Sequence, residues 1–326
     1  MAVASTSTST AITTADLPAR QDVTFRSGRE TCAAWLYPRP ASSGPAPSPA
    51  IVIGHGLGGV KEMRLDAYGE RFQRAGYTVL VFDYRYFGES TGEPRHLLSI
   101  RAQLADWAAA IAYVRSLEQV DPKRVAILGS SFGGGHAMSM AVRDPTLACA
   151  ISQCPFTSGF ASSKTVGLLT LPFIAIRALL DQLLGLLALI GLFRRWSIRV
   201  KLAGKPGEVA LMNRADVLPG IGDLIDLDKN WHRNFVGARI ALWLPLYFPG
   251  WAARKSRIPI FVGICGKDTV APPGPTLWYA KRIPKGEYAV YEDVGHFSIY
   301  IGKAFERAIA DYLAFLNKHV PIHKKP

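Results

Sequence analysis

The sequence has little cysteine and no internal repeats. Its four cysteines, Cys32, Cys149, Cys154 and Cys265, form no C-x-x-C pair. This spacing disfavours a zinc site or a disulfide framework and predicts buried, reduced thiols. Residues 1–20 lack both the basic start and the apolar block of a secretory signal. We therefore interpret residues 1–20 as a disordered tail and expect a cytoplasmic protein.

A long uninterrupted hydrophobic run is also missing. Residues 163–193 are strongly apolar, but Pro172, Arg177 and Asp181 interrupt them and leave Leu183–Phe193 as the longest clean part. That part is too short for a membrane span, which needs about 20 residues. We predict no transmembrane span. An apolar cap over an acyl pocket is our preferred interpretation of the segment, with membrane contact as the alternative.

The chain does contain an alternation of apolar strands and amphipathic helices. Residues 22–37 predict a two-stranded hairpin, and short apolar runs such as AIVIG (50–54) are typical of strands buried on both faces. The alternation stops at residue 156 and resumes at residue 258. We predict an α/β fold with a mostly parallel sheet and helices on both faces. Residues 21–155 and 258–318 would form its core, and residues 156–257 a helical cap insertion.

A candidate nucleophile lies in the stretch ILGSSFGGG (127–135), which contains two adjacent serines. A G-x-S-x-G motif between a strand and a helix is a nucleophile elbow, in which glycines two residues before and after the serine make room for a sharp turn. Ser131 has Gly129 and Gly133 at these positions, whereas Ser130 has no glycine at either. If one of the two is the nucleophile, the spacing selects Ser131.

A serine nucleophile needs a base and an orienting carboxylate, which follow it in the order Ser, Asp, His. Asp268 comes directly after the predicted strand 258–266, and His296 follows the last predicted strand. Both should therefore lie with Ser131 at the carboxyl edge of the sheet. We predict Ser131, Asp268 and His296 as the catalytic residues. His55 precedes the nucleophile and is interpreted as a brace for its loop, and His136 as packing or polar lining.

The transition state of acyl transfer also needs N–H donors for a developing oxyanion. The backbone N–H of Phe132, directly after the nucleophile, should supply one donor. The second should come from the loop GHGLGGV (54–60), where we predict the backbone N–H of Leu57. Phosphate binding by this loop is disfavoured because it lacks a lysine at the required spacing. We expect no metal and no cofactor, and the substrate-binding residues stay unassigned.

Five motifs together resemble the α/β-hydrolase superfamily: HGLGG (55–59), FDYRYFGES (82–90), GSSFGG (129–134), GKDTVAP (266–272) and VGHF (294–297). The resemblance implies an eight-stranded sheet and a mainly architectural role for residues 83–90. In pattern the chain is similar to polyketide-associated thiohydrolases and acyltransferases. It is also similar to hydrolases related to dienelactone hydrolases and X-Pro peptidases. Dienelactone hydrolases, however, use a cysteine where this chain has a serine.

These features predict a serine hydrolase that cleaves carboxylic ester or thioester bonds of an apolar acyl substrate through an acyl-enzyme on Ser131. The alternative is an acyltransferase that passes the acyl group from a carrier thioester to an alcohol or amine. A peptidase or amidase, or a non-catalytic binding protein of the same fold, fits less well. The oligomeric state is left open.

The formal net charge of +13 is unevenly distributed. Residues 156–257 hold 14 Lys and Arg against 6 Asp and Glu, and the segment FRRWSIRVKLAGK (193–205) contributes Arg194, Arg195, Arg199, Lys201 and Lys205 without a single acid. An acidic acyl carrier or coenzyme A is one candidate partner for this surface, and a merely solvated basic face is the alternative. No nucleic-acid-binding module accompanies the charge, so we expect no nucleic-acid partner.

Overall fold

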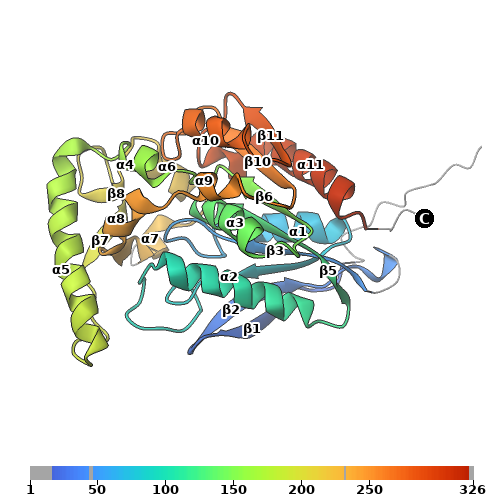
Figure 1. The fold of residues 1–326 in the computed structure, drawn as a ribbon, viewed down its shortest axis with the longest axis horizontal. Coiled ribbons are helices and arrows are strands. Elements are labelled where there is room, and N and C mark those ends of the chain that lie inside the picture. The colour runs from blue at the N-terminus through green and yellow to red at the C-terminus, as the bar shows by residue number, and fades with distance from the viewer. Residues whose placement is uncertain (1–16, 44–46, 231–232, 323–326) are drawn as a thin grey trace, which may run out of the picture.

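The predicted hairpin and the apolar strands form one eight-stranded sheet in a computed structural model (Figure 1). The model describes residues 17–43, 47–230 and 233–322, so residues 1–16 of the predicted tail lie outside the described residues. The strand order is β1-β2-β4-β3-β5-β6-β10-β11. β1 pairs with β2, and β2 with β4, in antiparallel fashion, and the remaining pairs are parallel. The prediction of a mostly parallel eight-stranded sheet is confirmed.

The elements of the core have the following bounds. The strands are β1 (Gln21–Ser27), β2 (Glu30–Tyr37), β3 (Ser48–Gly54), β4 (Thr78–Phe82), β5 (Val120–Ser130), β6 (Cys149–Gln153), β10 (Ile260–Cys265) and β11 (Gly286–Tyr291). The α-helices are α1 (Leu65–Arg74), α2 (Ile100–Arg115), α3 (Phe132–Arg143), α10 (Pro273–Ala280) and α11 (Gly302–His319). Short 3₁₀ helices cover Ala41–Ser43 and Ser298–Tyr300.

Helices cover both faces of the sheet and give the molecule two apolar cores. α2 and α3 pack on one face, and α1 and α11 on the other. β3 shows how the strands serve both cores: Val52 belongs to the first, whereas Ile51 and Ile53 belong to the second. All seven residues of β3 are buried, as expected for a central parallel strand. The four cysteines are buried free thiols, as predicted.

The residues between β6 and β10 form a separate layer over the carboxyl ends of the strands. Its elements are α4 (Gly159–Ser163), α5 (Leu171–Leu189), β7 (Arg199–Ala203), β8 (Ala210–Met212), α6 (Val217–Gly222), α7 (Leu227–Asn230), β9 (Phe235–Gly237), α8 (Ile240–Trp243) and α9 (Pro249–Ala253). Short 3₁₀ helices cover Leu168–Thr170 and Leu244–Leu246.

This insertion is not purely helical, and the prediction of a helical cap is incomplete. β8, β7 and β9 form a small three-stranded sheet. β7 carries a two-residue alternation, with Val200 and Leu202 buried while Arg199 is exposed. That alternation is typical of a strand, but the basic residues that share the segment obscure it in the sequence.

One helix among the described residues is long and apolar enough to cross a membrane by length and composition. It covers Leu168–Leu189, 22 residues with a mean hydropathy of 1.7. Pro172, Arg177 and Asp181 lie within this continuous helix and do not lower its mean hydropathy enough to exclude a span. The absence of a transmembrane span therefore stays a prediction. In Figure 1 the helix lies along one end of the molecule, beside α8 and β7.

Candidate active site

The turn between β5 and α3 holds Ser131 in a strained backbone conformation. Its φ of 57° and ψ of −118° lie outside the regions that side chains other than glycine usually adopt. A Cβ atom on Gly129 would collide with the carbonyl group of Gly133, and one on Gly133 would collide with the carbonyl oxygen of His55. The glycines at these two positions thus allow the sharp strand-to-helix turn that the motif predicts.

The structure brings the three predicted catalytic side chains together. The Ser131 hydroxyl donates to Nε2 of His296 at 2.9 Å, and Nδ1–H of His296 donates to Oδ2 of Asp268 at 2.7 Å. Asp268 follows β10 and His296 follows β11, so both meet Ser131 at the carboxyl edge of the sheet. The other Asp268 oxygen accepts from the backbone N–H groups of Val270 at 2.8 Å and Ala271 at 2.7 Å. These bonds fix the carboxylate that faces the ring.

Burial and charge act on His296 in opposite directions. The ring is buried, and burial favours its neutral form. Burial is the largest single influence, but the charge and hydrogen bond of the Asp268 carboxylate, together with the charges of Cys154 and Asp216, outweigh it and raise the pKa of His296 to about 9. A buried carboxylate in this position stabilises the imidazolium that forms when the ring accepts a proton.

Ser130 lies apart from this chain of hydrogen bonds. Its hydroxyl is fully buried, contacts the Tyr300 hydroxyl at 2.5 Å and accepts from the side-chain amide of Gln153 at 2.8 Å. The carbonyl oxygen of that amide accepts from the hydroxyls of Tyr68 and Tyr312, both at 2.9 Å. Sequence reasoning missed this network, because its members lie on five separate elements and no local motif connects them.

The loop after β3 lies directly against Ser131. A Cβ atom on Gly56 would come within 3.0 Å of the Ser131 Cβ, and Leu57 lines the cavities next to the serine. Phe132 opens α3, where backbone N–H groups lack a partner within the helix. The two predicted oxyanion donors thus belong to backbone segments that border the nucleophile.

Two further histidines near the site are neutral structural side chains. His55 donates from Nδ1 to the carbonyl oxygen of Gly56 at 3.0 Å, and burial lowers its pKa to about 4. This contact agrees with the brace predicted for it. His136 contacts the Tyr247 hydroxyl and the Gln103 side-chain oxygen, each at 2.9 Å, and burial lowers its pKa to about 3.

Two cavities meet at Ser131. The first is apolar, has about 730 Å³ of unfilled space that is partly open to solvent, and runs from Ser131 beneath the start of α5. Its walls include Phe156, Val166, Ile174 and Leu244. The second has about 500 Å³ of unfilled space. It lies on the side of His296 and reaches the small sheet.

Met212 borders both cavities, and Leu202 borders the second. Neither was predicted, since their access to the site depends on how the insertion folds over the core. The apolar walls with a few polar groups at one end are typical of a small-molecule site.

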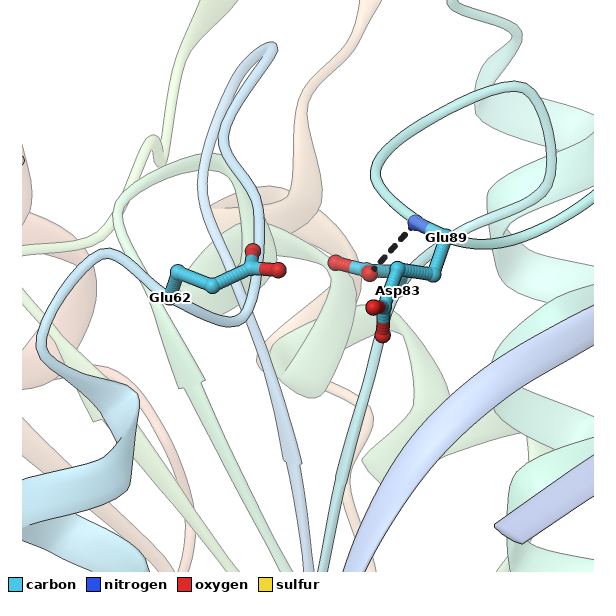
Figure 2. Close-up of side chains that lie close together, drawn as sticks. All are labelled: Glu62, Asp83 and Glu89. Carbon is cyan, nitrogen blue, oxygen red and sulfur yellow. Dashed lines mark hydrogen bonds between the residues drawn. The ribbon is translucent and has the colours of Figure 1, made fainter. Parts of the chain in front are cut away.

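A cluster of three carboxylates lies beneath the loop after β3 (Figure 2). The side chains of Glu62, Asp83 and Glu89 converge, with oxygens within 4.8 Å of one another. The ammonium group of Lys61, which is buried, lies 3.0 Å from Asp83 Oδ2 and 2.5 Å from Glu89 Oε2. The protein's own cation therefore satisfies these acids. A bound metal ion would have to displace it, and the role of residues 83–90 here is architectural.

Comparison with known proteins identifies the family. Residues 49–303 match the model of the alpha/beta hydrolase fold. The quorum-quenching protein AidA of Acinetobacter baumannii is 45% identical over 301 residues, which cover 92% of this chain and 95% of that protein. The thiohydrolase aneE of Aspergillus aculeatus is 28% identical over 298 residues, with 84% of this chain and 86% of that protein covered.

Solved structures show the same fold. The crystal structure of the alpha/beta hydrolase GrgF from Penicillium is 21% identical and superposes with a TM-score of 0.75. The match covers 93% of this chain and 99% of that one. The matched family model covers most of the sheet and includes the strand-to-helix elbow and the loops that carry Asp268 and His296. The chain therefore belongs to the α/β-hydrolase family.

Proposed function

We propose that the protein is a serine hydrolase that cleaves carboxylic ester or thioester bonds of small apolar acyl substrates. The observation that carries the proposal is the chain of hydrogen bonds from Ser131 through His296 to Asp268, located where two cavities meet. A strained serine, a base in contact with it and a carboxylate behind the base are the parts that nucleophilic acyl transfer requires.

The proposed reaction proceeds in two halves. Ser131 Oγ attacks the carbonyl carbon while its proton passes to Nε2 of His296, and the N–H groups of Leu57 and Phe132 bind the oxyanion. The intermediate collapses, the bond to the alcohol or thiol breaks, and the leaving group takes the proton from His296. Water then attacks the acyl-enzyme with His296 again as base, and the carboxylic acid leaves Ser131. Asp268 acts through His296 and orients the ring throughout.

The two cavities suggest where each part of the substrate lies. The apolar cavity beneath α5 fits the acyl chain, and the cavity beside His296 fits the leaving group that must receive a proton from that ring. A lactone is a cyclic ester, so the same steps would open its ring. The relative named for quorum quenching supports a small signal molecule as the first substrate class to test, and the thiohydrolase relative supports a thioester.

Acyl transfer is the alternative outcome of the same intermediate. An alcohol or amine that enters the cavity beside His296 would replace water as the attacking group. Mass spectrometry of the products with and without added acceptor alcohols separates the outcomes: hydrolysis yields only the free acid, and transfer yields the new ester.

A fluorophosphonate probe tests the nucleophile. We expect it to label the wild-type protein and to fail on Ser131→Ala, which should also lose roughly 10⁴–10⁶-fold in kcat on p-nitrophenyl butyrate. Ser130→Ala is the matched control. It should keep the label and lose only about 1–3 kcal/mol of stability, because it leaves Tyr300 and Gln153 without a partner. Equal labelling of Ser131→Ala and wild type would refute the proposal.

A further inference from the structure

The longest helix of the insertion exposes most of its apolar side chains. Only Ile174, Ala178 and Asp181 of α5 are buried. Leu169 and Leu189 are 86% and 79% exposed, and the apolar side chains between them are mostly half exposed or more. We call the exposed surface of residues 167–196 the α5 patch. Proteins rarely leave a continuous apolar surface of this length in water unless it binds something.

Between positions 156 and 200, basic side chains flank the α5 patch or lie within it, and no acidic side chain is exposed. Lys164, Arg177, Arg194, Arg195 and Arg199 are exposed. The one acidic residue between positions 156 and 200 is Asp181, which is buried and accepts from Arg239 Nε at 2.8 Å. The exposed surface is therefore both apolar and positively charged.

Hydrogen bonds of one buried side chain, Asp181, anchor the middle of α5 to the rest of the insertion. The Asp181 carboxylate also accepts from the backbone N–H groups of Ile198 at 2.7 Å and Arg239 at 2.9 Å. Gly185, one turn further along, packs so closely on the Arg239 guanidinium that a Cβ atom would collide with it. The helix thus lies flat on the protein with one side covered, which suits contact with a surface and does not suit a span.

We propose that the α5 patch docks the protein on the surface of an anionic lipid bilayer. The leucines and Phe173 would enter the boundary between headgroups and acyl chains, while the arginines and Lys164 contact anionic headgroups. Trp196, which is 68% exposed at the end of the patch, has the amphipathic ring that favours the headgroup level. Apolar area and positive charge on one face are the two components from which such binding is built.

Two other occupants fit the patch less well. A second copy of the chain would bring two surfaces of the same positive sign together, with no exposed acid on the patch to compensate. An acidic carrier protein would pair with the arginines but would leave the leucines along the rest of the helix in water. A bilayer with anionic lipids satisfies both components at once.

Docking would also place the first cavity beside the lipid. Leu171 and Ile174, at the start of α5, line that cavity, and Leu168 and Leu169 just before them belong to the patch. An acyl substrate dissolved in the bilayer would then have a short path to Ser131. This consequence rests on the proposed function, whereas the docking itself does not.

Co-sedimentation with vesicles tests the docking. We expect wild-type protein to bind phosphatidylcholine vesicles that contain a minority of phosphatidylglycerol at least tenfold more tightly than pure phosphatidylcholine vesicles, and high salt to weaken the binding. Leu179→Asp/Leu183→Asp and Arg194→Glu/Arg195→Glu should each lose tenfold or more. The matched control is Lys123→Glu/Lys303→Glu, which reverses two exposed charges on β5 and α11, outside the insertion, and should bind nearly as wild type does.

Further measurements separate the docking from folding and from catalysis. Circular dichroism should show that the Asp variants fold, and they should keep wild-type activity on p-nitrophenyl acetate, because Leu179 and Leu183 line neither cavity at Ser131. Ser131→Ala should bind vesicles as wild type does. Brominated lipids should quench tryptophan fluorescence, and Trp196→Phe should reduce that quenching.

Three results would overturn the proposal. The first is an absence of vesicle binding together with a dimer in sedimentation velocity that Leu179→Asp/Leu183→Asp dissociates, which would assign the patch to a second copy. The second is binding of an acyl carrier protein without vesicle binding. The third is equal binding to neutral and anionic vesicles, which would remove the role of the basic rim.

Discussion

β3 and α5 are both strongly apolar, yet the fold treats them in opposite ways. All seven residues of β3 are buried, whereas α5 buries only Ile174, Ala178 and Asp181 of its 19 residues. β3 has a strand on either side and a helix layer on each face, and α5 has the body of the protein on one side alone. An apolar composition therefore indicates that a segment tends to be buried, and the number of elements packed against the segment determines whether it is buried.

The core, which contains β3, and the insertion, which contains α5, also contribute different parts of the candidate site. Ser131, Asp268 and His296 follow β5, β10 and β11, so the core supplies the three side chains of the candidate site. The insertion supplies walls, through residues such as Met212, and an outer surface. Changes in the core should therefore alter chemistry and stability, and changes in α5 should alter what the protein binds. Each prediction below probes this division.

The largest effect is expected in the core, for Asp268→Asn. An amide leaves His296 without the charge that stabilises the imidazolium, so kcat should fall by roughly 10³–10⁴-fold. The kcat/KM of the wild type should rise with pH around a midpoint near 9, because the ring must be neutral to accept the Ser131 proton. In the variant, the His296 ring loses the largest of the charges that raise its pKa, so the pKa falls and the midpoint should move to lower pH.

Asp293→Asn is the matched control for this change. Asp293 is only three residues from His296, but its side chain is 91% exposed and pairs with Lys267 at 2.9 Å. Its loss should leave both the rate and the pH profile nearly unchanged, since exposed ion pairs contribute little. A pH profile of Asp268→Asn with the wild-type midpoint would contradict the role given to Asp268.

The core was more predictable than the insertion, for a physical reason. Ser131, Asp268 and His296 could be nominated because the turn motif and the ends of buried strands leave short local signals, and the sheet brings those ends together. Their contact is observed, and their catalytic role stays a proposal. The bond between Ser130 and Tyr300 and the access of Met212 to the site depend on packing between distant segments. No local pattern reports such packing.

The exposure of α5 was missed for the same reason. Apolar residues at 163–193 favoured a cap over a pocket, and the first turn of α5 does line a cavity. The rest of the helix points away from it. Hydropathy cannot distinguish a helix that is covered on two faces from one that is covered on a single face. The number of covered faces depends on which other elements of the fold pack against the helix.

The next effect concerns the attachment of α5 to the rest of the insertion. Asp181→Ala leaves the Arg239 guanidinium, which is 17% exposed, without its carboxylate, and should cost about 3–5 kcal/mol of unfolding free energy. Replacement of both partners, as Asp181→Leu/Arg239→Met, should recover the part of that loss that comes from the unpaired guanidinium, because apolar pairs can substitute for buried ion pairs. The backbone N–H groups of Ile198 and Arg239 still lose their acceptor, so the recovery should be partial. Urea unfolding followed by circular dichroism gives both values. Equal losses in the single and double variants would show that the pair does not hold α5 in place.

The smallest effects form a matched pair of truncations, one in each region. Ile53→Ala in β3 removes a fully buried side chain and should cost about 2–5 kcal/mol of unfolding free energy. Leu183→Ala removes a side chain that is 53% exposed and should change stability by no more than about 0.5 kcal/mol. The effects on vesicle affinity should rank the other way. Leu183→Ala should weaken vesicle binding, and Ile53→Ala should leave it unchanged as long as the protein is folded.

Urea unfolding of Ile53→Ala and Leu183→Ala measures their loss of stability, and vesicle co-sedimentation of the same two variants measures their loss of affinity. A loss of stability in Leu183→Ala as large as that in Ile53→Ala would mean that the α5 patch is already covered in solution. Because cover by a second copy depends on protein concentration, repeating the unfolding over a dilution series would identify it. Unfolding that is independent of concentration, with a small loss for Leu183→Ala, would leave α5 as an apolar surface that the protein keeps open for a partner.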